Sequence, residues 1–78
     1  MDFFTYAIRN EKDGRIYVGM SRDVDRRILE HNGGFVKSTK AYRPWKIIFK
    51  KLMGNRADAR KEEKRLKSDY GKEYLKNL

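Results

Sequence analysis

Two short segments near the start of the chain have the apolar pattern of β-strands. Residues 3–9 and residues 15–19 are rich in aromatic and β-branched side chains, which favour extended backbone. The polar residues 10–14 between them include an Asp-Gly dipeptide, a turn signal typical of hairpins. The pattern therefore predicts a β-hairpin. The loop lengths that suit it pair even-numbered with odd-numbered positions, so Tyr6 and Tyr17 are expected on one face of the sheet.

A helix is predicted directly after the hairpin. Ser21 or Asp23 can cap its first turn, because each side chain accepts hydrogen bonds from the free N–H groups there. Val24 and Ile28 recur at helical spacing and supply the apolar side. The glycines that follow Asn32 end the helix, since glycine tolerates the left-handed backbone of a C-cap.

The second half of the chain has a loop, a strand and two further helical segments. Residues 35–44 are polar and basic, and residues 45–52 have the apolar and aromatic composition of a third strand. A helix is expected over about residues 56–69, with Gly71 interrupting it before a last helical turn at residues 72–77. The element order strand, strand, helix, strand, helix, short helix predicts an α+β domain with a small mixed sheet on which the helices pack.

Length and composition narrow the class further. A chain of 78 residues is expected to be one domain, residues 1–78, near the lower size limit for a self-sufficient core. Without cysteine it has neither disulfides nor a zinc site of the cysteine type. No apolar run approaches the roughly 20 residues of a membrane span, and the start lacks the features of a signal peptide. A cytoplasmic location without membrane contact is expected.

The net charge favours a polyanionic partner. Lys and Arg total 20 against 11 Asp and Glu, which gives +9 at pH 7 with the histidine neutral. Nucleic acid is the first candidate, because basic side chains displace the counterions condensed on phosphates. An anionic membrane surface is the second, and a charge that serves only solubility is the third.

The first helix carries a candidate phosphate-binding face. Asp23, Arg27 and His31 are spaced i, i+4, i+8, so they stack along one side. Two interpretations remain open. Either this side is a solvated helix edge on which Asp23 and Arg27 form a weak surface pair, or Arg27 and His31 are aimed together at a phosphate.

The second helix carries a carboxylate on its apolar side. Its apolar stripe consists of Ala59, Leu66 and Tyr70. Glu63 falls on the same face and lies nearer the centre of the stripe than Glu62 does. A carboxylate turned toward the sheet is costly unless a cation or a bound metal satisfies it. The alternative is a Glu63 at the edge of the stripe that pairs with Lys67.

Five short elements follow one another along the chain: Thr5-Tyr6-Ala7, Tyr17-Val18-Gly19, Arg27, His31 and Glu63. In order and spacing they resemble the GIY-YIG nuclease family, and the similarity runs from about Phe3 to Leu78. It is greatest to the small stand-alone bacterial members, and it extends to the nuclease domain of the excision-repair incision subunit. The resemblance implies a small three-stranded antiparallel sheet flanked by helices.

The resemblance also implies an activity, namely hydrolysis of a DNA phosphodiester with one divalent metal, usually magnesium, with manganese as a substitute. Glu63 matches the metal-binding glutamate of the family, and Arg27 matches the arginine that stabilises the phosphate. His31 matches a residue often found one helical turn after that arginine. No small-molecule cofactor is implied.

The two tyrosines match the two half-motifs of the family. Tyr17 corresponds to a proposed general base or water-positioning group, and Tyr6 helps to shape the site. A free phenol has a pKa of about 10, so His31 or solvent remains an alternative proton acceptor. Some members carry a lysine where this chain has Met20, and Arg22 is a candidate to replace that charge.

A basic surface binds the nucleic-acid backbone without reading sequence, so little sequence specificity is expected, with a role in DNA repair or recombination. The side chains expected to contact DNA are Arg22, Arg26, Lys37, Lys40, Arg43 and Lys67. An inactive nucleic-acid-binding module and a protein-interaction domain are the two alternative functions. Exposed Trp45 or Phe35 would favour dimerisation, although the sequence leaves the oligomeric state open.

Overall fold

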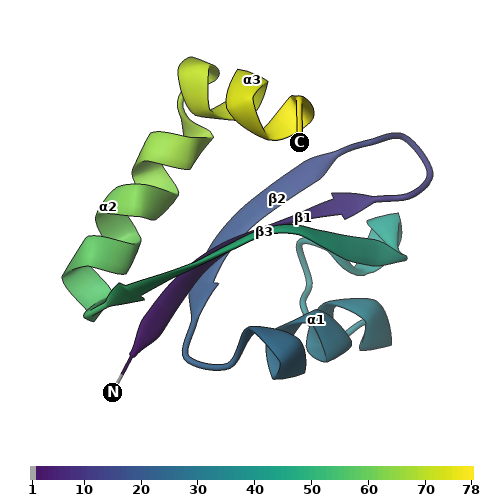
Figure 1. The fold of residues 1–78 in the computed structure, drawn as a ribbon. Coiled ribbons are helices and arrows are strands. Elements are labelled where there is room, and N and C mark those ends of the chain that lie inside the picture. The colour runs from purple at the N-terminus through teal and green to yellow at the C-terminus, as the bar shows by residue number, and fades with distance from the viewer. Residues whose placement is uncertain (1) are drawn as a thin grey trace.

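The fold is built on a three-stranded sheet with the first strand in the centre. The computed structural model describes residues 2–78. The strands are β1 (Phe3–Asn10), β2 (Ile16–Ser21) and β3 (Trp45–Gly54). Their spatial order is β2-β1-β3, and both pairings are antiparallel (Figure 1). The antiparallel sheet implied by the family resemblance is therefore confirmed, and the mixed sheet inferred from the element order is wrong.

The register of the hairpin places both tyrosines on one face, as the sequence predicts. Tyr6 lies opposite Gly19, and Ile8 lies opposite Tyr17. Because side chains alternate along a strand, Tyr6, Ile8 and Tyr17 all project to the same side of the sheet. The turn is closed by the Asn10 side chain, which accepts hydrogen bonds from two backbone N–H groups of the loop.

Helix α1 (Val24–Gly33) covers the face that carries the tyrosines. Asp23 caps its first turn by accepting from the backbone N–H of Arg26, and Gly34 ends it in the left-handed conformation with φ of 83°. The buried core on this side of the sheet consists of Tyr6, Ile8, Val24 and Trp45.

Helices α2 (Arg56–Lys67) and α3 (Asp69–Lys76) lie across the other face of the sheet (Figure 1). Thr5 fastens α2 to the central strand, since its hydroxyl donates to the carbonyl of Ala59 at 2.9 Å. The buried core on this side consists of Ala7, Val18, Leu66 and Leu75. The sheet is thus the middle of three layers.

The boundary between the last two helices differs from the expectation. The break falls at Ser68, which ends α2 and caps α3 by accepting from the N–H of Gly71. Gly71 lies buried inside α3, where a Cβ would overlap the backbone of Arg65 and Leu66. It is therefore a contact residue between two helices and not a helix breaker, because only glycine allows this close approach.

Two further expectations about burial, for Tyr70 and for Trp45, are wrong. Tyr70 belongs to α3 and is 79% exposed, so it does not extend the apolar stripe of α2. Trp45 is 5% exposed, because its indole N–H donates to the carbonyl of Thr39 and its ring joins the core, whereas Phe35 is 83% exposed. The loop that precedes Trp45 also contains a short 3-10 helix, Lys40–Tyr42.

Among residues 2–78, no helix is long and apolar enough to cross a membrane.

Candidate active site

The Tyr6 hydroxyl is at the centre of the candidate site. The side chain is 1% exposed, and its oxygen lies 2.8 Å from Nε2 of His31. Gly19, directly across the hairpin, makes room for it, since a Cβ at that position would lie 2.8 Å from the Tyr6 oxygen. The glycine of the second half-motif is therefore required by the packing of the tyrosine of the first.

Tyr17 lies beside this pair on the edge strand. Its ring centroid is 5.1 Å from that of His31 in an edge-on arrangement, and the side chain is half-buried. Both tyrosines thus contact one imidazole. Because Tyr17 is partly open to solvent while Tyr6 is enclosed, Tyr17 is the tyrosine better able to meet a substrate.

Arg27 brings the positive charge of the site. Its guanidinium donates to Oε1 of Glu30 at 2.9 Å, one helical turn further along α1. The expected pair with Asp23 is not formed, because that carboxylate caps the helix instead. Arg27 remains 37% exposed at its side chain, and Glu30 holds it in place without covering it. An open hollow of about 390 Å³ beside it is lined by Met20, Ser21, Arg22, Asp23, Arg26, Arg27 and Glu30.

His31 is fully buried, so the solvated helix edge is wrong for this residue. Its Nδ1 lies 2.8 Å from the hydroxyl of Thr39 on the loop that follows α1. Burial, and after it the charge of Arg27, lowers the pKa of His31 to about 4. The imidazole is therefore neutral at pH 7 and is a poor acceptor for a second proton at that pH.

Glu63 supplies the negative charge from the opposite layer. Its side chain is 15% exposed, and Oε2 accepts from Nζ of Lys67 at 3.1 Å. The pairing with Lys67 considered from the spacing is therefore formed. The charge of Glu63 also reaches across the sheet to the phenol of Tyr6, whose pKa it helps to raise.

Glu62, and not Glu63, is the more buried of the two carboxylates. Its side chain is 7% exposed, and Arg65 donates to both of its oxygens at 2.7 and 2.8 Å. The helix is rotated so that Ala59, Glu62 and Leu66 form its buried line. The expectation placed Glu63 in this position because it counted Tyr70, which lies beyond the break at Ser68, as part of the same stripe.

The pKa of the Tyr6 phenol depends on several of the predicted site residues. Burial raises the pKa of its phenol to about 12, and the charge of Arg27 opposes that increase, while Tyr17 and Glu63 add to it. These three groups come from α1, β2 and α2. Three of the other four predicted catalytic residues therefore influence the phenol of Tyr6, and the fourth, His31, is hydrogen-bonded to it.

The donor set limits which metal the site suits. No group of three or more His, Cys, Asp or Glu side chains gathers within residues 2–78. A single carboxylate at Glu63 fits an ion such as Mg²⁺, which retains several waters and is held by one or two carboxylates together with substrate phosphates. It does not fit a zinc ion, which takes three or four protein ligands. If a metal binds there, the ammonium of Lys67 has to share the Glu63 carboxylate with it or move away.

The basic residues expected to contact DNA divide into two groups. Arg22 and Arg26 border the hollow next to Arg27, and Lys67 adjoins Glu63. Lys40 and Arg43 instead line a separate hollow after α1, and Lys37 is exposed on the same loop. The structure therefore brings only the first group close to the candidate site.

A basic groove adjoins the site at the free edge of β2. Its volume is about 350 Å³, and it runs between this strand and helices α2 and α3. Apolar side chains form its floor, and Tyr17 lies along it. The charged residues that line it are all cationic: Arg15, Lys67, Lys72 and Lys76. The lysines on α3, Lys72 and Lys76, are thus candidates for contact with nucleic acid in addition to Lys67.

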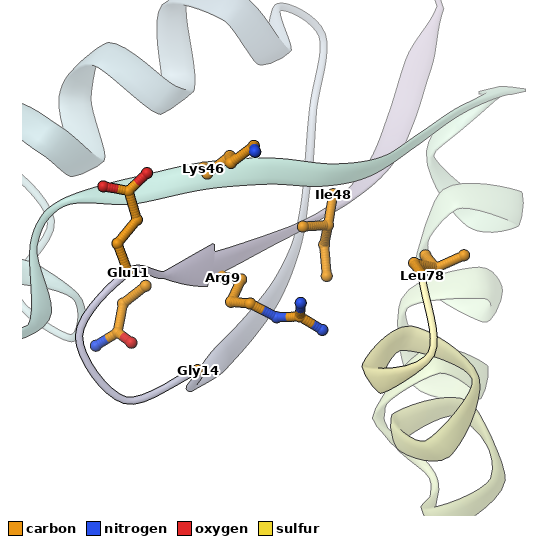
Figure 2. A pocket seen from close by; sticks show the side chains of 7 residues that line it. Arg9, Glu11, Gly14, Lys46, Ile48 and Leu78 are labelled. Carbon is orange, nitrogen blue, oxygen red and sulfur yellow. The ribbon is translucent and has the colours of Figure 1, made fainter.

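Another hollow lies at the turn of the hairpin and the end of α3, and neither Arg27 nor Glu63 lines it. It measures about 520 Å³ and is lined by residues of the hairpin, β3 and the chain end, including Arg9 and Leu78 (Figure 2). Arg9 points toward the end of α3, where its guanidinium donates to the carbonyls of Leu75 and Lys76. Its charge therefore serves to hold α3, as cations near helix C-termini do.

Comparison with known proteins identifies the class of protein. A family model described as the GIY-YIG catalytic domain matches residues 2–77, which is nearly the whole chain. The chain belongs to the GIY-YIG family, a nuclease family whose substrates are nucleic acids.

Its relatives are small bacterial proteins named UPF0213. One from Staphylococcus saprophyticus is 34% identical over 58 residues, which are 73% of this chain and 71% of that protein. One from Staphylococcus epidermidis is 31% identical over 76 residues, covering 96% of this chain and 92% of the relative. The solution NMR structure of a UPF0213 protein from Bacillus halodurans superimposes with a TM-score of 0.58 at 32% identity. That match covers 96% of this chain and 82% of the other.

Proposed function

We propose that this protein is a metal-dependent endonuclease that hydrolyses phosphodiester bonds in DNA. The observation that carries the proposal is the match of the GIY-YIG catalytic domain model to residues 2–77. Its support in the structure is the cluster in which the Tyr6 hydroxyl lies 2.8 Å from His31 and the ring of Tyr17 packs edge-on against the same imidazole. Arg27 on α1 offers a partly exposed cation for a phosphate, and Glu63 on α2 offers a carboxylate for a metal.

Each site residue has a separate role in the proposed hydrolysis. Arg27 offers a planar fork that binds two phosphate oxygens, and Glu30 holds that fork in place. A divalent metal at Glu63 would polarise a phosphoryl oxygen and stabilise the leaving oxygen. Tyr17, the half-buried tyrosine, would orient the attacking water. Solvent accepts its proton, because the pKa of His31 is lowered to about 4 and its ring nitrogens are already occupied.

The surface charge supports a nucleic-acid substrate bound with little sequence specificity. The hollow beside Arg27 and the groove beside Tyr17 are both bordered by basic side chains. Such residues contact phosphates, which carry no sequence information. Recognition by shape, as of nicked, flapped or branched DNA, would place the enzyme in repair or recombination.

The test is cleavage of supercoiled plasmid and of branched oligonucleotides in Mg²⁺ or Mn²⁺, comparing wild type with Glu63→Ala. We expect cleavage by the wild type, none above background by Glu63→Ala, and binding of DNA by both. Glu73→Ala is the matched control, because this glutamate is exposed on α3 and pairs with Lys76 of the same helix. Absence of cleavage, or cleavage that survives Glu63→Ala, would overturn the proposal.

A second function is favoured by one contact. The ammonium of Lys67 already neutralises the Glu63 carboxylate at 3.1 Å, which is what a binding module without a metal requires. In that case the protein binds nucleic acid in a salt-sensitive manner and does not cut it. The variant Lys67→Met distinguishes the two functions. If the protein is a binding module, this variant remains inactive. If it is a metal-dependent nuclease, the variant frees the Glu63 carboxylate for the metal, and cleavage at low magnesium is kept or raised.

A further inference from the structure

The hydroxyl of Thr39 holds the far side of the His31 ring. Thr39 is 1% exposed, and its Oγ1 lies 2.8 Å from Nδ1 of His31. Nε2 of the same ring lies 2.8 Å from the hydroxyl of Tyr6. The three side chains therefore form one continuous buried chain of hydrogen bonds, which ends at the oxygen on which the candidate site converges.

The hydrogen bonds among Tyr6, His31 and Thr39 can be donated in either of two directions. A neutral imidazole carries one hydrogen, on either Nδ1 or Nε2. Burial keeps His31 neutral at pH 7, since it lowers the pKa of the ring to about 4. Either Nδ1–H donates to Thr39 and Nε2 accepts from Tyr6, or Nε2–H donates to Tyr6 and Nδ1 accepts from Thr39.

The surrounding acceptors select the first direction. When Nδ1–H donates to Thr39, the hydroxyl of Thr39 can donate in turn to the carbonyl of Val36 at 3.4 Å. The Tyr6 phenol then donates to Nε2, and every hydrogen of the chain has an acceptor. In the opposite direction the buried phenol hydrogen of Tyr6 has no acceptor within residues 2–78, because nearby Arg27 is only a donor.

The backbone of the loop fixes Thr39 independently of its hydroxyl. Its N–H donates to Val36 at 3.2 Å, and its carbonyl accepts from the N–H of Tyr42 at 3.1 Å. The same carbonyl accepts from the indole of Trp45 at 3.0 Å. Removing the hydroxyl alone therefore leaves the loop anchored and isolates its effect on the ring.

We propose that Thr39 is a positioning residue of the nuclease site, whose hydroxyl selects the Nδ1–H tautomer of His31. The selected tautomer makes Tyr6 the donor in its bond to His31, so the phenol oxygen keeps its lone pairs free to accept hydrogen bonds. Tyr6 then does not take a proton from water. This inference rests on the proposed function, because it assigns the orientation of groups within the same site.

The tautomer is directly measurable, because His31 is the one histidine of the chain. In ¹⁵N-labelled protein at pH 7, long-range ¹H–¹⁵N correlations of the ring are expected to show a protonated Nδ1 and an unprotonated Nε2. Thr39→Val, which keeps the β-branched shape, is expected to shift the ring toward the Nε2–H form, and Thr39→Ser to restore the wild-type pattern. Thr5→Val is the matched control, since Thr5 is equally buried but donates to Ala59 on the other face.

A protonated Nε2 in the wild type, or a Thr39→Val spectrum identical to the wild-type one, would overturn the proposal. The wild-type spectrum is decisive even if Thr39→Val fails to fold. In the cleavage assay Thr39→Val is expected to lose about tenfold to a hundredfold in rate, the range typical of partners that orient a functional side chain, while Thr39→Ser retains most of it. Full activity of Thr39→Val contradicts the positioning role. A wild type that never cleaves refutes the proposed function, while the spectrum still decides the tautomer.

Discussion

The hydroxyl of Tyr6 occupies the space beside Gly19 that a side chain would need. A Cβ on Gly19 would lie 2.8 Å from the phenol oxygen and 2.9 Å from the carbon that bears it. The ring cannot withdraw, because it is enclosed by the core and hydrogen-bonded to His31. The two half-motifs of the family are therefore one packing unit, in which the glycine makes room for the tyrosine across the hairpin.

Gly19→Ala is expected to displace Tyr6, to destabilise the protein by about 1–3 kcal/mol and to reduce cleavage strongly. Urea unfolding and the plasmid assay measure the two effects. Gly33→Ala is the matched control, since its Cβ would also lie 2.8 Å from a side chain, but that side chain is the exposed ring of Phe35, which is free to move. Equal losses in the two variants would show that the packing of Tyr6 is not special.

Tyr17→Phe removes one oxygen and little else. If this hydroxyl orients the attacking water, cleavage is expected to fall by about a hundredfold or more, while DNA binding changes little. Tyr70→Phe, at a side chain that is 79% exposed, serves as the control and should cut at the wild-type rate. Undiminished cleavage by Tyr17→Phe rules this tyrosine out as base or water-positioning group.

His31 makes the stability of the fold depend on pH. Burial lowers its pKa from 6.5 to about 4, so the unfolded chain binds the proton more tightly than the folded one. Stability is therefore full above pH 6.5 and falls as the pH drops toward 4, by up to about 3 kcal/mol. Urea titrations at pH 7 and at pH 4.5 measure this change. His31→Gln is expected to be less stable at pH 7 and to lose the pH dependence of this window, and an unchanged dependence would assign it to other groups.

Lys72 tests the groove at the edge of β2. It lines the groove and has no ion-pair partner within the part of the chain that the structure describes, residues 2–78. Lys72→Ala is expected to weaken DNA binding and to reduce the slope of log K against log salt by about 1. Lys61→Ala removes the same charge from an exposed position of α2 outside the groove. Identical slopes for the two variants would mean that only total charge matters.

The hairpin and its shared face follow directly from the sequence, because strand pairing depends on local pattern and loop length. The partners of His31 do not. Its contact with Tyr6 joins residues 25 positions apart, and its contact with Thr39 depends on the path of an irregular loop. Periodicity detects that a residue lies on a helix face, but it does not reveal what the opposite element places there.

The two glutamates of α2 illustrate a different limit. Glu62 and Glu63 are neighbours, so a small rotation of the helix exchanges their burial. A stripe that includes Tyr70 gives the wrong rotation, because α2 ends before Ser68 and Tyr70 belongs to α3. By contrast, the pairing of Arg27 with Glu30 follows from i, i+3 spacing and was available from the sequence.

The layered assembly of the site has a consequence for the order in which the protein is made. Synthesis from the N-terminus produces both tyrosines, Arg27 and much of the basic surface well before Glu63, which belongs to the layer added after β3 closes the sheet. A chain that stops before α2 therefore lacks both the carboxylate proposed for cutting and the residues Leu66 and Leu75 that complete the core on that face of the sheet. If the proposed function is correct, the ability to cleave appears only together with the complete fold.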